Sequence, residues 1–266
     1  MKNIFLIIFF CFLSNNLRAE TISTVTTDET TKTITEDLTI TSTGSRTCES
    51  RNTCVKVDAE GLTITNRGTL DNSGDDTDIV IKASGSDDAN DVKIYNYGTM
   101  SATGNSTLFI PNLEDNNSDG IGGYVYNSGT ITAGRTFTIR YHSSNLIKID
   151  NYGTISNTNS NGQALFGYGD TNTTINNYSS GTISASNGKY AIHTTESGGD
   201  AFSTNTTINN WGTITAPKET ISLGISSTIN NYGSIISENT NKFSIRARGN
   251  NNKVNLYDGT ILVGYL

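Results

Sequence analysis

The chain has 266 residues, of which 34% are hydrophobic and 16% charged, with 25 acidic against 18 basic side chains. A net charge of −7 argues against binding to nucleic acid or to anionic membrane surfaces, because both attract basic proteins. We therefore expect no nucleic-acid partner.

The first 19 residues have the pattern of a secretory signal peptide. Lys2 gives a basic start, residues 4–13 form an apolar run of ten, and a polar segment ends at Ala19, where cleavage is expected. The apolar run is about half as long as a membrane-spanning helix. Loss of Lys2 and Arg18 leaves 16 basic and 25 acidic residues, a net charge of −9 (16 − 25). The chain is therefore expected to be exported.

Residues 20–60 are rich in threonine, and polar and apolar residues alternate along them, but they lack the repeat unit of the later chain. Solenoid proteins need an atypical end that shields the first coil, so this segment is expected to cap the repeats. Its two cysteines, Cys48 and Cys54, enclose five residues. In an oxidising compartment they are expected to form a local disulfide. A metal site is the alternative, although no histidine lies nearby.

Residues 61–266 repeat one unit: an apolar residue, a polar residue, Asn, an aromatic residue, Gly, Thr and an apolar residue. Residues 208–214, Ile-Asn-Asn-Trp-Gly-Thr-Ile, are a clear copy, and eight copies follow one another at intervals of 21 to 31 residues. Asn-x-Gly predicts a turn in which the glycine adopts a positive φ. The expected turn and ladder residues are Asn66, Gly68, Asn96, Gly98, Asn127, Gly129, Asn151, Gly153, Asn177, Gly181, Asn210, Gly212, Asn231 and Gly233.

A third apolar cluster, such as Phe243-Ser244-Ile245, lies between each unit and the next. Three short strands per period, with no helical pattern between them, predict an all-β chain coiled as a parallel β-solenoid. About eight rungs, each with three strands, are expected. A meander of β-hairpins is the alternative.

Stacking of the rungs places equivalent residues above one another. The isoleucines then form the core, and asparagines in register are expected to form amide ladders. The residues that follow the asparagines predict an aromatic column at one corner, interrupted by Arg67 and Ser128. Stacking for stability is the favoured role of this column, and a ligand-binding strip is the alternative. Its expected members are Tyr97, Tyr152, Tyr178, Trp211 and Tyr232.

The sequence shows no motif of an enzyme. The only histidines, His142 and His193, have no nucleophile at a recognisable spacing and are expected on the surface or in loops. Outward strand positions are interpreted as Thr, Ser and Asn, with Lys148 and Asp150 as the exception. Acidic clusters such as Asp75-Asp76-Thr77-Asp78 match no calcium-binding spacing, so neither a metal nor a cofactor is expected. A polysaccharide-acting enzyme on the same scaffold remains the alternative.

Repeats such as Ile-Asn-Asn-Tyr-Gly-Ser-Ile (residues 229–235), behind a secretion signal, resemble the passenger region of bacterial autotransporters. The resemblance covers residues 20–266 and implies a right-handed β-helix at the surface of a Gram-negative bacterium, at its outer membrane or outside the cell. Such proteins are commonly adhesins, with a glycan or protein of a host or neighbouring cell as partner. A purely structural surface component is the alternative.

The same resemblance implies a translocating outer-membrane β-barrel in the same chain. Residues 259–266 are apolar and follow a repeat turn without a polar cap, which would expose strand edges and core side chains. We therefore expect the natural protein to continue beyond residue 266. No catalytic residues are implied by the resemblance.

Overall fold

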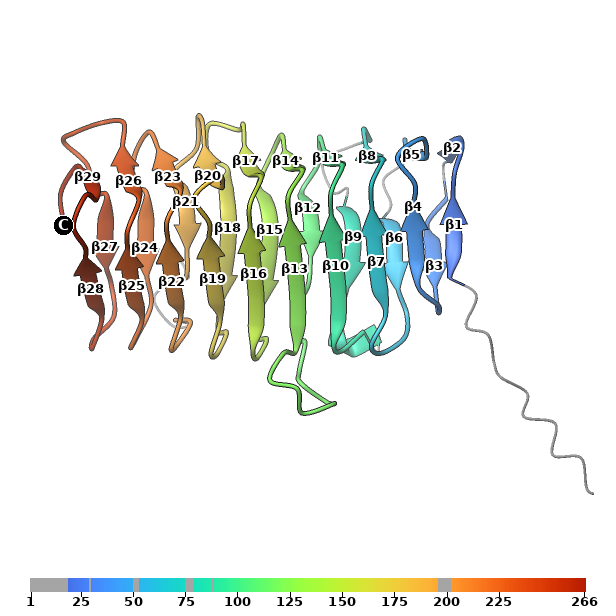
Figure 1. Ribbon diagram of the computed structural model, residues 1–266, viewed down its shortest axis with the longest axis horizontal. Helices are drawn as coiled ribbons and strands as arrows, with labels where there is room; N and C mark the ends of the chain where they lie inside the picture. The colour runs from blue at the N-terminus through green and yellow to red at the C-terminus, as the bar shows by residue number, and fades with distance from the viewer. Residues whose placement is uncertain (1–18, 29, 50–52, 75–78, 88, 196–201) are drawn as a thin grey trace, which may run out of the picture.

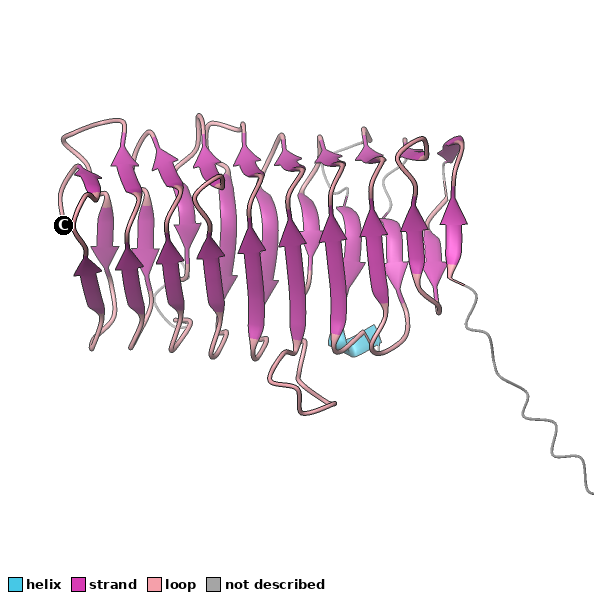
Figure 2. Cartoon of the chain, viewed as in Figure 1, coloured by secondary structure: helices cyan, strands magenta, loops and turns pink. Residues whose placement is uncertain are grey.

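The computed structural model describes residues 19–28, 30–49, 53–74, 79–87, 89–195 and 202–266. Within them the chain forms a rod of stacked coils made of three parallel β-sheets (Figure 1). The one helix of the described residues is a short 3-10 turn, Gly85–Asp87 (Figure 2). The predicted right-handed parallel β-helix is confirmed. The expected signal peptide, apart from Ala19, and the acidic residues 75–78 lie outside the described residues.

Successive strands of the chain join successive sheets, so each coil contributes one strand to each sheet. In the described residues the first sheet has ten strands: β1 (Glu20–Ile22), β4 (Leu38–Ile40), β7 (Thr63–Asn66), β10 (Val92–Asn96), β13 (Gly123–Asn127), β16 (Ile147–Asn151), β19 (Thr174–Asn177), β22 (Thr207–Asn210), β25 (Thr228–Asn231) and β28 (Lys253–Leu256). The second sheet likewise has ten among these residues: β2 (Val25–Asp28), β5 (Ser45–Cys48), β8 (Thr69–Asn72), β11 (Thr99–Ala102), β14 (Thr130–Ala133), β17 (Thr154–Asn157), β20 (Thr182–Ala185), β23 (Thr213–Ala216), β26 (Ser234–Ser237) and β29 (Ile261–Val263). The third has nine in the same part of the chain: β3 (Lys32–Ile34), β6 (Thr53–Val57), β9 (Ile79–Ala83), β12 (Ser106–Phe109), β15 (Phe137–His142), β18 (Gln163–Tyr168), β21 (Tyr190–His193), β24 (Ile221–Leu223) and β27 (Ile245–Ala247).

The coils begin before the repeat unit does. Strands β1–β6 place residues 20–57 in the same three sheets, so the described chain has ten coils where eight copies of the unit were counted. Threonines alternating with Ile22, Leu38 and Ile40 give the same inward pattern without Asn-x-Gly. Cys48 and Cys54, at the end of β5 and in β6, are joined in a disulfide with their Cα atoms 5.6 Å apart.

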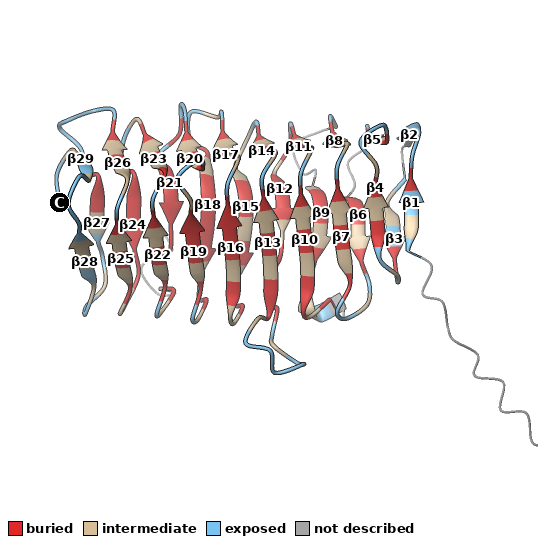
Figure 3. Ribbon diagram, in the orientation of Figure 1, coloured by how far each residue is buried: buried red, intermediate tan, exposed pale blue. Residues whose placement is uncertain are grey.

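The core is a set of columns that run along the rod. In the first sheet Ile94, Ile149, Ile208 and Ile229 stand in one register column, and all four are fully buried. Buried residues line the sheets along the length of the rod (Figure 3). A fully buried isoleucine side chain stabilises the fold by about 1.5–3 kcal/mol relative to an exposed one. Because neighbouring coils provide this burial, a single coil is not stable alone.

The repeat glycines are required for a reason other than the one predicted. None of the seven expected turn glycines has a positive φ; among the repeat glycines of the described residues it occurs at Gly259, in the last copy. A Cβ atom on Gly129 or Gly153 would lie less than 3.0 Å from the carbonyl oxygen of the equivalent glycine in the preceding coil. The positive-φ interpretation was therefore wrong for these seven: glycine is needed there because adjacent coils approach too closely for a side chain.

Replacement of Gly153 by alanine is expected to lower the free energy of unfolding by about 3 kcal/mol, because the clash is with backbone that is held by both neighbouring coils. Gly134→Ala is the control, since its Cβ atom would lie 3.5 Å from the nearest atom, an ordinary contact. Its unfolding free energy should change by less than about 0.5 kcal/mol. Chemical denaturation measures both, and equal effects would contradict the close-approach explanation.

Candidate functional site

A buried ladder of asparagines runs beside the isoleucine column of the first sheet. The Nδ2 atom of each asparagine donates to the Oδ1 atom of the asparagine in the next coil at 2.7–2.8 Å. Each Nδ2 atom from Asn66 to Asn210 also donates to a main-chain oxygen of that next coil, as Asn151 does to Thr182 at 3.2 Å. The amides are fully buried and hydrogen-bonded to one another, so within the ladder they fix the register of the coils at little cost in unpaired polar groups. Its members are Asn66, Asn96, Asn127, Asn151, Asn177, Asn210 and Asn231.

This inner ladder has a direction and two ends. All its amides donate toward the C-terminus, so the Oδ1 atom of Asn66 is left as the first acceptor. Ile40 precedes Asn66 in the column, and among the described residues this oxygen has no hydrogen-bond partner. Leu256 follows Asn231 and ends the ladder at the other side. The ladder therefore begins and ends where the sequence replaces asparagine by an aliphatic residue.

A second, outer ladder was not predicted. Asn176 donates to the carboxylate of Asp150 at 2.7 Å, and Asn209, Asn230 and Asn255 each donate to the amide of the preceding coil at 2.7–2.8 Å. Its direction is opposite to that of the inner ladder. An ionised carboxylate can only accept, so Asp150 sets the orientation of the amides that follow.

The aromatic residues form an uninterrupted stack at one corner of the rod. Tyr152 and Tyr178 lie 4.0 Å apart between ring centroids, and Trp211 lies 5.5 Å from Tyr178 and 5.4 Å from Tyr232. Tyr126 fills the expected gap at Ser128, because its ring contacts those of Tyr97 and Tyr152. The guanidinium of Arg67 caps the stack over Tyr97, 4.6 Å from the ring centroid, and Tyr257 extends it at the other end.

The rings of this stack cover one another's faces. Tyr97, Tyr152, Trp211 and Tyr232 remain 38–40% exposed. A sugar ring that binds by stacking needs a free aromatic face, whereas rings between two neighbours present only their edges to solvent. This geometry favours stability over ligand binding as the role of the stack.

Trp211→Ala is expected to lower the free energy of unfolding by about 2 kcal/mol, because it removes two ring contacts. Thermal denaturation and binding to glycans or cells should be measured on the same preparation, and binding should be unchanged at temperatures where the variant is folded. Loss of binding without loss of stability would instead assign the stack to recognition.

The outer face of the third sheet differs from the other two. Its central register column contains Lys56, Lys82, Phe109, Arg140, Phe166 and His193. The expectation that outward positions are Thr, Ser and Asn was therefore wrong for this sheet, and also for the middle of the first sheet, where Lys93, Tyr95 and Tyr124 point outward. The guanidinium of Arg140 lies 5.0 Å from the ring centroid of Phe109 and 5.3 Å from that of Phe137. Phe109 and Phe166 belong to the third apolar clusters of the sequence, but the sequence did not show that these two residues point outward.

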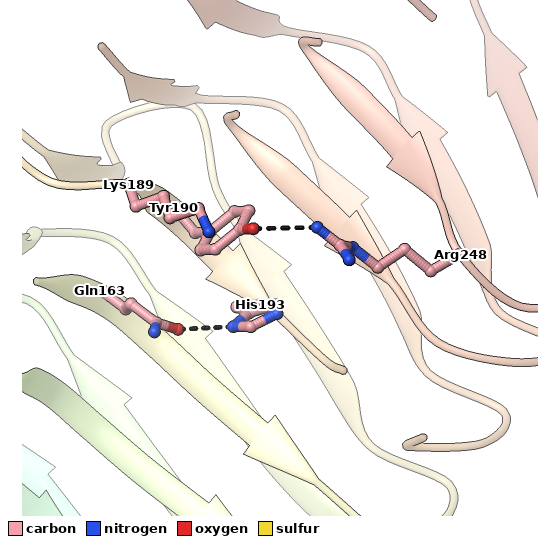
Figure 4. Close-up of a pocket in the computed structure, with 5 residues that line it drawn as sticks. All are labelled: Gln163, Lys189, Tyr190, His193 and Arg248. Atoms are coloured by element: carbon pink, nitrogen blue, oxygen red, sulfur yellow. Dashed lines mark hydrogen bonds between the residues drawn. The ribbon is translucent and has the colours of Figure 1, made fainter. Parts of the chain in front are cut away.

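A pocket of about 150 Å³ opens on this face, lined by Gln163, Lys189, Tyr190, His193 and Arg248. Gln163 is in β18, Tyr190 and His193 are in β21, and Arg248 follows β27 and reaches toward the Tyr190 hydroxyl (Figure 4). Arg248 Nη2 donates to that hydroxyl at 3.1 Å. The centroids of the Tyr190 and His193 rings lie 4.1 Å apart, and the Lys189 Nζ atom lies 4.9 Å from the centroid of the Tyr190 ring.

Both histidines lie on strands, at the ends of β15 and β21. His193 is buried, so its expected placement on the surface or in a loop was wrong, whereas His142 is partly exposed. Burial, with the charges of Arg248 and Lys189, lowers the pKa of His193 to about 3. Burial and Arg140 lower the pKa of His142. His193 is therefore neutral at physiological pH.

Neutral His193 belongs to an ordered chain of hydrogen bonds. Its Nδ1 atom donates to Gln163 Oε1 at 2.8 Å, so its Nε2 atom accepts from the hydroxyl of Thr195 at 2.8 Å. Thr195 in turn accepts from Ser222 at 3.3 Å, and Ser222 accepts from Arg248 Nε at 3.0 Å. The Gln163 oxygen can only accept and each hydroxyl has a single hydrogen, so the direction of every bond follows from Gln163 and agrees with Arg248 as a donor.

This arrangement does not form an accessible nucleophile. Thr195 and Ser222 are fully buried, so no substrate carbon can approach their hydroxyl oxygens in this structure. The groups that face the pocket are donors: the Gln163 amide nitrogen, the Lys189 ammonium and the Arg248 guanidinium. The pocket is thus suited to hold an anion.

Comparison with protein-family models, curated proteins and solved structures finds no match for the chain. The site must therefore be interpreted from its own chemistry. In the described residues, no group of three or more His, Cys, Asp or Glu side chains is placed to hold a metal ion. Over the same residues, no helix is long and apolar enough to span a membrane.

Proposed function

We propose that the chain is a non-catalytic, exported β-solenoid, similar to an autotransporter passenger, that acts in adhesion at a bacterial surface. The observation that carries this proposal is the outer face of the third sheet, where cations and aromatic rings surround a pocket lined by hydrogen-bond donors. Arginine and aromatic side chains are enriched in protein recognition surfaces, whereas the threonine- and asparagine-rich faces are suited to solubility.

The scaffold supports such a role because its coils are cross-linked along much of the rod. Each strand inside a sheet pairs with a neighbour on both sides, and the inner ladder and the aromatic stack cross-link successive coils. A surface built on such strands keeps its geometry without a ligand, which lowers the entropic cost of binding. The predicted secretion signal and the resemblance of the repeats to autotransporter passengers support a location of this surface outside the cell.

The test is adhesion of beads coated with the mature protein to cells and to a glycan array, with polysaccharide turnover measured in parallel. We expect specific binding without turnover. Arg140→Gln, on the third-sheet face, should reduce binding at least fivefold, whereas Lys253→Gln removes the same charge from the first sheet and should have no effect. Turnover would favour the enzyme alternative, and folded protein that binds neither cells nor glycans would favour a purely structural component.

A further inference from the structure

We propose that the pocket lined by Gln163, Lys189 and Arg248 binds the carboxylate or sulfate group of an acidic saccharide. This inference rests on the adhesive function proposed above and names the ligand class of its site.

Three side chains at the pocket have hydrogen-bond donors without an acceptor among the described residues. Gln163 uses its oxygen to accept from His193, which leaves its Nε2 atom without an acceptor among the described residues. In the same residues Lys189 forms no ion pair and contacts only the face of the Tyr190 ring through its ammonium. Arg248 uses its Nε and Nη2 atoms, and no hydrogen bond of Nη1 is seen there. Lys189 and Arg248 are exposed and Gln163 is half-buried, so an anion at this shared opening would replace water at three donors.

The surroundings of the pocket carry more positive than negative charge. Glu219 is the acidic group that pairs with Arg248: its carboxylate lies 3.4 Å from Arg248 Nη2 and 3.1 Å from Nη1 of the neighbouring Arg246. One carboxylate therefore faces two guanidinium groups, and Lys189 adds a further positive charge. The low pKa of His193, caused by burial and by Arg248 and Lys189, agrees with this local excess of positive charge. An anion gains charge-assisted hydrogen bonds here, although the whole protein is acidic.

The size and lining of the pocket indicate the class of molecule that carries the anion. The pocket volume of about 150 Å³ is roughly five times the share of one water in the liquid, enough for an oxyanion and part of a sugar ring. Strands β18 and β21, which carry Gln163, Tyr190 and His193, are paired on both sides, so neither offers an open edge to an extended peptide. Tyr190 is only 2% exposed, so the pocket offers little apolar surface to a peptide side chain. Sugar hydroxyls, in contrast, can both donate and accept at the surrounding polar groups.

The experiment is calorimetric titration of the mature protein, at low and at physiological salt. The probes are a sulfated heparin oligosaccharide, an oligogalacturonate that carries only carboxylates, a neutral dextran oligosaccharide and a poly-glutamate peptide. We expect one of the two acidic saccharides to bind, and the neutral one not to bind. Lys189→Ala should weaken that binding about tenfold, and Gln163→Glu, which places a carboxylate in the pocket, should abolish it. Lys253→Ala, with the same loss of charge on the first sheet, should change it less than twofold.

Binding that is lost equally in the Lys189 and Lys253 variants would overturn the inference, because it would reflect net charge alone. Preference for poly-glutamate over both saccharides, or no saccharide binding by folded protein, would also overturn it. Arg248→Lys serves as a second variant, since it keeps the charge but loses the guanidinium hydrogen bonds. Cell adhesion is measured separately: adhesion that persists without saccharide binding removes this inference alone, whereas saccharide binding without adhesion removes the adhesive function.

Discussion

Asn151→Ala is expected to lower the free energy of unfolding by about 5 kcal/mol. The substitution removes three hydrogen bonds. The Nδ2 atom of Asn127 and the Oδ1 atom of Asn177 each lose an amide partner, and the main-chain oxygen of Thr182 loses the bond that it accepts from Asn151. Each unpaired buried group costs about 1–3 kcal/mol, and alanine restores none of these bonds. Denaturant unfolding followed by circular dichroism measures the change.

The matched control is Asn209→Ala in the outer ladder. Asn209 makes the same amide-to-amide contacts, with Asn176 and Asn230 at 2.8 Å, but it is only partly buried. Water can replace its bonds, so the loss should stay below about 1.5 kcal/mol. If the two variants lose the same stability, burial is not the reason that the inner ladder matters.

Asp170 is expected to make stability fall as pH rises from about 4 to 7. Its carboxyl is fully buried, and burial raises its pKa to about 7, although hydrogen bonds from the Ser144 amide and the Ser203 hydroxyl act in the opposite direction. The unfolded chain titrates at the ordinary value of 3.8. Between these values the folded state holds a proton that the unfolded state has lost, so each pH unit costs about 1.4 kcal/mol, or about 4 kcal/mol in all.

Other groups titrate in the same range, so the test compares two proteins. His193, with its lowered pKa, makes stability fall toward acid instead, because the unfolded chain binds a proton below about pH 6.5 that the folded chain refuses. Asp170→Asn keeps the shape of the side chain and removes only the titration of Asp170. The unfolding free energy of the variant minus that of the wild type should therefore rise by about 4 kcal/mol between pH 4 and pH 8. A difference that does not change with pH would show that Asp170 is ionised in the folded state throughout.

The fold was largely predictable because the same residue types recur at equivalent positions of successive coils. Isoleucines two positions before each asparagine indicated an inward strand, and the structure places Ile94 and Ile149 in one column as expected. The first two coils were missed because threonine alternation in residues 20–57 carries no asparagine or glycine marker. Ile22 and Ile40 nevertheless point inward in the same column, since the alternation alone sets that direction.

The candidate site was not predictable, because it is made of residues from different coils. Gln163, His193 and Arg248 are 30 and 55 residues apart (193 − 163, 248 − 193), and only the register of the third sheet brings them together. No motif spacing relates them, since the loops between the coils vary in length. The order of the hydrogen bonds through Thr195 and Ser222 depends in the same way on which coil lies beside which.

The sequence by itself thus determined the strand pattern, the isoleucine column and the asparagine ladder, because each depends on alternation within one coil and on repetition between coils. The tertiary structure decided which way the third-sheet side chains point, why the repeat position must be glycine, and which cations share the pocket. These features depend on distances between neighbouring coils, and such distances are set by packing that a single repeat does not contain.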